Sequence, residues 1–345
     1  MFTDISLQGQ TAYAQTVEAL QSQEITRCIA DVSGSFNRKI IGERSYWYYQ
    51  SRLLDGRVHQ TYLGPDSERL KALIDKRKSE QAERGAVPTA LAQHAVKLGC
   101  EGFLPLHLRV IHKLADEGFF RAGGVLIGTH AFLAAGNSLG VRWGVGERTQ
   151  DLDFAHAGKN LSVALPANAQ LDLHDAIDAL ALGFVPANSL DGVRGGSWVH
   201  PKDPTFRLDF LTPMTRANQN LVRVPAFNAE FQALRFMEFS LEGVSQAAAI
   251  SRVGEPCLVT VPDPARMAIH KLIVCGLREG GFAVKANKDL AQAASLIAFY
   301  AARSPEALAA AHADALSRGP KWRSQLNKGV VLLAQRYPTQ AAALA

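Results

Sequence analysis

Cysteine is scarce in this chain of 345 residues, and its four copies are scattered with no Cys-x-x-Cys pair: Cys28, Cys100, Cys257 and Cys275. This spacing argues against a disulfide framework and against a clustered zinc site. We therefore expect reduced, mostly buried thiols in a cytoplasmic protein.

Long apolar runs are also missing. No stretch of 18 apolar residues occurs, so we expect no membrane span. Residues 1–20 contain Asp4 and Glu18 and lack a basic start followed by an apolar run, which argues against a signal peptide. A Ser-His-Asp order and an internal repeat are absent too. A dinucleotide fingerprint is also absent, because no strand-and-helix pattern flanks the glycines of 192–196.

The composition that remains is typical of a globular protein. Hydrophobic residues make up 47% of the chain, enough for a sizeable core. The length fits two or three domains. A net charge of +5 permits a polyanionic partner without requiring one.

The most informative stretch begins with the apolar run Val125–Ile127, which leads into Gly128-Thr129 and then a helical pattern over about 130–139. Glycine lets a backbone approach a phosphate, and the first N–H groups of a helix favour an anion. The alternative for Thr129 is an ordinary helix N-cap, which is compatible with that role.

Three acids lie in strand-like surroundings downstream. Side chains alternate faces along a strand, so Asp151 and Asp153 share one face, and Asp209 shares a face with Arg207. If the two strands are neighbours, three carboxylates converge, and a hard divalent cation such as Mg²⁺ relieves their repulsion. The alternative is that each acid caps a turn in solvent, which explains the acids singly but not together.

These motifs together resemble the polymerase-β-type nucleotidyltransferase superfamily. The strings Ile127-Gly128-Thr129, Thr149–Phe154 and Arg207–Phe210 are closest to a bacterial nucleotidyltransferase-fold family of largely unassigned substrate, over about 104–297. The resemblance implies that Asp151 and Asp153 hold Mg²⁺ on an NTP. It also implies that Asp209 completes a second metal site and helps to deprotonate an acceptor hydroxyl.

A second group of charged residues resembles the helical half of abortive-infection and toxin-antitoxin nucleotidyltransferases: Lys271, Arg278, Lys285, Lys288 and Asp289. The resemblance implies that the basic members face the triphosphate. Two departures stand out, since Lys-Asp replaces the commoner Arg-Asp and the connecting loop is longer. The alternative is a solvated basic face.

Other candidates near these motifs have weaker support. Arg142, Arg148 and Arg207 are candidate partners of phosphate or of the acids, with Arg207 the strongest because of its shared face. We expect His130 in the first helical turn. His156 is interpreted as a surface residue at a strand end rather than a metal ligand.

The N-terminal region reads as a helix, an antiparallel sheet and a charged helix, at 11–31, 39–41, 46–52, 58–63 and 67–83. Its strands interleave aromatic and basic residues: Tyr46, Trp47, Tyr48 and Tyr49 with Lys39, Arg44, Arg52 and Arg57. This pattern is typical of a stacking platform for nucleic acid. The alternative is that the aromatics are strand formers packed against helices.

The whole pattern predicts an α/β (α+β) protein with a mixed sheet in the core. We expect an N-terminal accessory region at 1–100, a catalytic core at 101–225 and a mainly helical region at 226–345. Expected elements include a helix at 172–182 and, further on, strands at 247–251 and 257–261 and helices at 264–277, 287–300, from 305, and 321–337.

The expected activity is Mg²⁺-dependent transfer of NMP from NTP to an acceptor hydroxyl. RNA is the favoured acceptor, a protein or small molecule is the alternative, and an antitoxin partner fits the toxin-like half. A rival hypothesis is a non-catalytic nucleic-acid-binding protein of the same fold.

Overall fold

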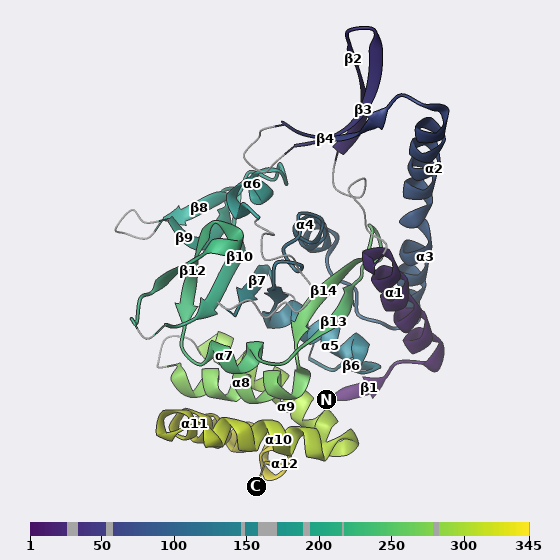
Figure 1. Ribbon diagram of the computed structural model, residues 1–345. Coiled ribbons are helices and arrows are strands. Elements are labelled where there is room, and N and C mark those ends of the chain that lie inside the picture. The colour runs from purple at the N-terminus through teal and green to yellow at the C-terminus, as the bar shows by residue number, and fades with distance from the viewer. Residues whose placement is uncertain are drawn as a thin grey trace.

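The computed structural model describes residues 1–25, 34–52, 58–145, 149–157, 171–188, 194–215, 217–278 and 283–344 (Figure 1). It is a mixed α/β protein, as the sequence predicts. None of the described helices combines the length and apolar content that crossing a membrane needs.

The N-terminal region contains a sheet that stands apart from the core in Figure 1. Its antiparallel strands are β2 (Gly34–Ile41), β3 (Arg44–Arg52) and β4 (Val58–Pro65), paired in that order as expected. The helices of the N-terminal part are α1 (Leu7–Ile25), α2 (Glu68–Arg84), α3 (Ala86–Lys97) and α4 (Pro105–Asp116). Helix α1 begins four residues earlier than predicted, because the Ser6 hydroxyl accepts a hydrogen bond from the Gly9 N–H at 3.2 Å.

The central sheet has the order β11-β12-β10-β7-β5, with β9 paired to β10 and β8 to β9. Its strands are β5 (Gly124–Leu126), β7 (Asp151–His156), β8 (Val185–Asn188), β9 (Arg194–His200), β10 (Asp203–Pro213), β11 (Leu221–Val224) and β12 (Ala229–Leu234). Strand β10 runs parallel to β7 and to β12, and antiparallel to β9. The sheet is therefore mixed, as expected.

Two short helices and a separate strand pair accompany this sheet. The strand pair joins β1 (Phe2–Asp4) to β6 (Val141–Trp143). Helix α5 (Gly128–Ser138) follows β5. Helix α6 (Leu173–Asp178) is capped by Asp172, whose Oδ1 accepts from the His174 and Asp175 N–H groups. It is shorter than predicted, because the chain turns through positive φ at Ala181 and Gly183.

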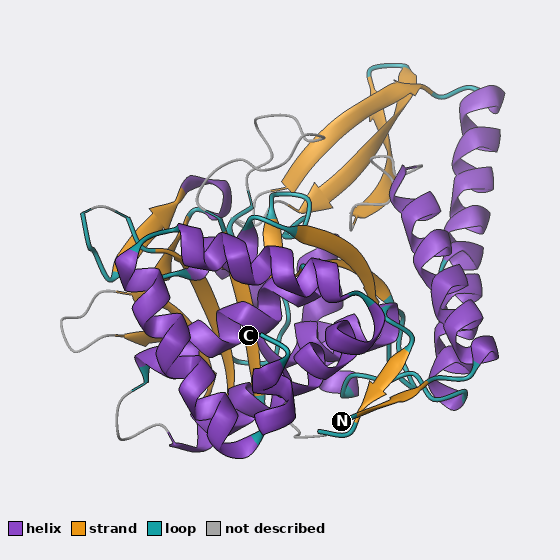
Figure 2. Cartoon of the chain, turned by 90° about the horizontal axis from the view of Figure 1, so that it is seen from below, coloured by secondary structure: helices purple, strands orange, loops and turns teal. Residues whose placement is uncertain are grey.

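The C-terminal part is mainly helical. It contains α7 (Met237–Leu241), a hairpin of β13 (Val244–Ala249) and β14 (Cys257–Pro262), and then α8 (Pro264–Leu277), α9 (Ala283–Arg303), α10 (Pro305–Ser317), α11 (Pro320–Arg336) and α12 (Pro338–Ala342). Seen from below, these helices lie in front of the strands (Figure 2). Strands β11 and β12 were not expected, although the alternating burial of β12 is a strand pattern. They carry the sheet past residue 225, and the three-part division of the chain stays a prediction.

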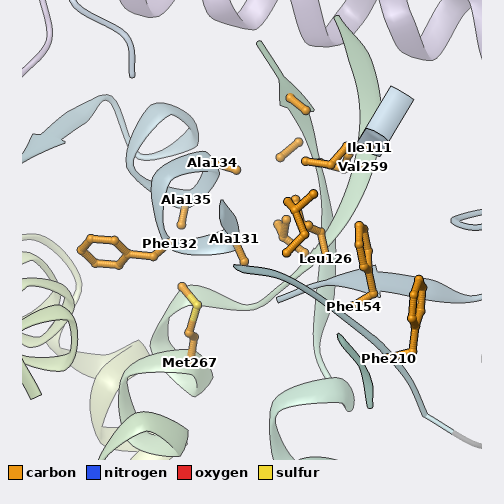
Figure 3. Packing of buried hydrophobic residues seen from close by; sticks show 14 of the residues in the cluster. Ile111, Leu126, Ala131, Phe132, Ala134, Ala135, Phe154, Phe210, Val259 and Met267 are labelled. Carbon is orange, nitrogen blue, oxygen red and sulfur yellow. The ribbon is translucent and has the colours of Figure 1, made fainter. Parts of the chain in front are cut away.

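The core is built on stacked aromatic rings under the sheet (Figure 3). Leu152, Phe154, Leu208 and Phe210 are fully buried, and the Phe154 and Phe210 rings stack with centroids 5.1 Å apart. These residues alternate with the three acids along β7 and β10. Burial of this face therefore directs the acids to the opposite one.

The C-terminal helices pack closely through glycine. Gly276 on α8 lies against the Gln325 carbonyl of α11, and Gly329 on α11 lies against the Leu272 carbonyl of α8. A Cβ at either glycine would overlap backbone of the other helix, so both positions require glycine for this approach.

We expect Gly276→Ala to lower the free energy of unfolding by about 1–3 kcal/mol, because α8 and α11 must move apart. Thermal unfolding measures this as a lower Tm. Gly144→Ala is the matched control, since its Cβ would meet only ordinary contacts with Met1. Equal Tm values for both variants would contradict the close packing.

Candidate active site

The strands that carry the acids are direct neighbours. In the parallel pairing of β7 and β10, Asp153 lies opposite Asp209 and Asp151 lies opposite Arg207. Adjacent strands lie about 4.8 Å apart, so the three carboxylates start from adjoining positions on one face. The geometry expected from the sequence is present.

The face of the sheet that carries the three acids is covered by apolar residues further along the strands. Ala155, two residues beyond Asp153, packs with Met237 and Leu241 of α7 in a small apolar cluster. The carboxylates therefore lie at the end of the sheet where this cover stops.

Burial and charge repulsion both act on Asp153. Burial raises the pKa of Asp153 to about 7, and the carboxylates of Asp209 and Asp151 add to the rise, while Lys285 and Lys271 oppose it. Cations beside these oxygens would remove the repulsion.

Protein donors engage the other two acids. Asp209 Oδ1 accepts from the Ser197 hydroxyl at 2.6 Å and lies 3.7 Å from Arg207 Nη2. Asp151 Oδ2 lies 3.5 Å from Lys285 Nζ. As they stand, no three His, Cys, Asp or Glu side chains of the described residues form a group that could hold a metal ion. The donor set itself fits a hard divalent cation, because three carboxylates on adjoining positions supply the oxygen ligands and the negative charge that Mg²⁺ prefers.

Gly128 is shaped by the acid beside it. Its φ is +67°, and a Cβ there would overlap Asp153 Oδ2. Only glycine suits both the left-handed conformation and this approach. Helix α5 starts at Gly128, beside Asp153, and no side chain of the described residues caps it. Its first N–H groups therefore lie near the acids without a capping partner from that part of the chain.

The Thr129 side chain is buried and contacts α9. Its side chain is 7% exposed, and its hydroxyl accepts a hydrogen bond from Gln292 Nε2 on α9 at 3.4 Å. Helix α9 therefore contacts the start of α5 directly.

Two basic residues of the second charged group, Lys271 and Arg278, are engaged by an acid rather than solvated. Lys271 is buried, and its Nζ lies 2.8 Å from Asp289 Oδ1, while Arg278 Nη1 lies 2.5 Å from Asp289 Oδ2. Burial acts to raise the pKa of Asp289, but Lys271 and Arg278 outweigh it and lower the pKa overall. Lys271 and Arg278 thus join α8 to α9 through one carboxylate.

The other two basic residues lie on α9, which begins four residues earlier than predicted. Lys285 reaches Asp151, as described above. Lys288 is close enough to His130 to lower the pKa of that imidazole. Both lysines therefore lie on the acids' side of the molecule.

Three further candidates have different outcomes. Arg142 lies on β6, where its Nε is 3.3 Å from Glu101 Oε2. Arg148 lies outside the described residues. The prediction for His156 is wrong, because the side chain is 3% exposed and burial lowers its pKa. It lies against Gly123, under the sheet's first strand.

Sequence reasoning missed Ser197, Gln292 and His107. Ser197 meets Asp209 only through the antiparallel pairing of β9 with β10. His107 Nδ1 lies 3.0 Å from His130 Nε2, across 23 residues of sequence. No local pattern marks any of these three residues.

Asp153→Asn should become more stable relative to the wild type as pH rises. The wild-type carboxyl keeps its proton up to about pH 7 when folded, whereas an unfolded Asp loses it near the ordinary value of 3.8. The folded state therefore binds more protons in this window, and the stability of the wild type falls as pH rises through it. The asparagine variant has no such loss.

Thermal unfolding in metal-free buffer at several pH values from 4 to 8 measures this difference. Asp178→Asn, an exposed change on α6, is the control for removing a carboxylate away from the three acids. A constant offset between Asp153→Asn and the wild type across this pH range would contradict the raised pKa of Asp153.

Comparison with known proteins agrees with this geometry. A family model described as Nucleotidyltransferase matches residues 106–317, which include α5, the acid-bearing strands, α8 and α9. No curated protein and no solved structure matched the chain. The matched span covers more than half of the chain, so this protein belongs to that nucleotidyltransferase family and is a nucleotidyltransferase enzyme.

Proposed function

We propose that this enzyme transfers NMP from an NTP to a hydroxyl group of RNA, with a divalent cation such as Mg²⁺. The register that sets Asp153 beside Asp209, with Asp151 two residues away and Gly128 against Asp153, carries the proposal. In the reaction, the acceptor oxygen bonds to the α-phosphorus, the bond to the β-phosphate oxygen breaks, and pyrophosphate leaves.

Asp151, Asp153 and Asp209 are the proposed metal ligands. The bound cations would neutralise the charge on the phosphates and on the departing pyrophosphate. Asp209 also receives the proton of the acceptor hydroxyl. The hydrogen bond from Ser197 fixes the orientation of the Asp209 carboxylate for this step.

Gly128, Thr129 and the first N–H groups of α5 are the proposed cradle for the triphosphate. Lys285 is 64% exposed and sits beside Asp151, so it can turn from that carboxylate to a phosphate oxygen. Arg207 and Lys288 supply further positive charge on this side. We assign Lys271 and Arg278 mainly a positioning role, because both are engaged by Asp289.

The two faces of the N-terminal sheet differ, and only one of them favours RNA as the acceptor. On one face Tyr49 is 2% exposed, its ring packs edge-on against Phe36, and Lys78 of α2 lies over the Phe36 ring. Trp47 donates to Asp66 Oδ1 at 2.9 Å. These aromatics are packing residues.

The other face carries a group of aromatic rings, of which Tyr46 and Tyr48 are half-buried and Tyr62 is exposed. The Tyr62 ring lies 5.5 Å from that of Tyr48 and 6.1 Å from that of Tyr46, and Lys39 lies over the Tyr48 ring. Tyr62 is 54% exposed. Residues 34–52 carry four basic side chains and one acid. Stacking rings with positive charge are what unpaired bases and their phosphates bind.

Incubation with each α-labelled NTP, Mg²⁺ and total cell lysate, followed by separation of RNA from protein, tests the reaction. We expect label in RNA with the wild type and none with Asp151→Asn or Asp153→Asn, because either change removes a metal-binding charge. Asp178→Asn is the matched control and should keep full transfer. Transfer retained in both site variants would refute the metal assignment, and label in protein would refute the RNA acceptor.

The face of the N-terminal sheet that carries Tyr46, Tyr48 and Tyr62 has its own test. Replacing both Tyr48 and Tyr62 with alanine should raise the KM for RNA at least tenfold, since each lost stack costs about 1–3 kcal/mol. The KM for NTP should not change. Ile41→Ala, an exposed change at the tip of the same sheet, is the control. An unchanged KM for RNA would place the acceptor elsewhere.

A further inference from the structure

A cavity of about 440 Å³ lies near the strand that carries Asp151 and Asp153. It lies between the segment 99–105, the flank of α5, β6 and Thr149. The Thr149 hydroxyl accepts a hydrogen bond from the Asp151 N–H at 3.3 Å, so the cavity reaches to within two residues of the first acid. Its volume lies in the range of small-molecule sites.

His130 lies in the wall of this cavity and has a buried polar atom that no described residue engages. The side chain lines the cavity and is 3% exposed. Its Nε2 is bonded to His107 Nδ1, but its Nδ1 is buried without a hydrogen-bond partner among the described residues. An unpaired buried polar atom costs about 1–3 kcal/mol, and a ligand with a polar edge would recover this.

The imidazole is neutral at ordinary pH. Burial, together with His107 and Lys288, lowers the pKa of His130 to about 3. Nδ1 therefore accepts or donates one hydrogen bond, according to the tautomer, and carries no charge. The Phe103 ring packs edge-on against the imidazole at 5.0 Å and holds its orientation.

The remaining walls combine apolar surface with positive charge. Leu104, Pro105 and Leu133 line the cavity. Arg142 is paired with Glu101, whereas Arg252 is exposed and has no ion pair with any described residue. The occupant should therefore have flat apolar faces, a hydrogen-bonding edge and an attached anion.

We propose that this cavity binds a nucleobase, with its polar edge toward the His130 side chain and a phosphate of the same nucleotide near Arg252. The inference rests on the proposed function, which supplies two sources for the base: the incoming NTP, or the terminal nucleotide of the RNA acceptor. Both have the same chemistry, so the test must separate them.

Leu133→Trp fills the cavity from the flank of α5, and Arg252→Ala removes the charge at its rim without touching the core. Val253→Trp, an exposed change next to the cavity, is the matched control. Calorimetry with the full chain and Mg²⁺ measures the Kd of each NTP, of inorganic tripolyphosphate and of the dinucleotide ApA. Thermal unfolding checks that each variant is folded.

If the base of the NTP occupies the cavity, Leu133→Trp should raise the Kd of NTP at least tenfold and leave that of tripolyphosphate unchanged. If the acceptor base occupies it, the same variant should raise the Kd of ApA at least tenfold and leave NTP binding unchanged. In either case Arg252→Ala should weaken the same ligand several-fold. Binding of NTP and ApA as tight as in the wild type, in both variants, overturns the proposal.

These binding measurements need no turnover. Base-dependent binding without NMP transfer would leave the cavity assigned and remove the proposed reaction. NMP transfer by the wild type, together with unchanged binding of NTP and ApA in both variants, would support the proposed reaction and remove the cavity assignment.

Discussion

The parallel pairing of β7 with β10 is the constraint on which the site depends. The buried face of these strands sets the register, because Phe154 stacks on Phe210 and both are fully enclosed. A slip of one residue would exchange Asp153 with a phenylalanine and expose the core. The aromatic packing under the sheet therefore positions the carboxylates above it. The acids repel one another, and the energy that keeps them together comes from the opposite side of the sheet.

The C-terminal helices contribute side chains to the proposed site rather than merely covering it. Helix α9 contributes Lys285 at Asp151 and Gln292 at Thr129. Its position depends on α8, to which it is joined by Asp289 between Lys271 and Arg278. The glycine contacts between α8 and α11 extend this arrangement outward. Stability of the helical part and geometry of the acids are thus coupled through a few polar contacts.

The N-terminal sheet shows how one sequence pattern can support two interpretations at once. Strand alternation divides its aromatics, so that Tyr49 and Trp47 pack inward while Tyr48 faces outward with Tyr62. The sequence alone left both interpretations open for the whole segment. The choice between them is made residue by residue, by the face on which each side chain lies.

The sequence by itself determined the features that depend on local spacing. These include the two-residue separation of Asp151 and Asp153, the glycine before α5, the three-stranded N-terminal sheet and most helices of the C-terminal part. It did not reveal β11 and β12, the burial of His156, or the partners Ser197, Gln292 and His107. Those features depend on contacts between segments distant in the chain, where the energy comes from burial and pairing that no local pattern records. Only the tertiary structure decided that Lys271 pairs with Asp289 and that one nitrogen of His130, beside a cavity, has no partner among the described residues.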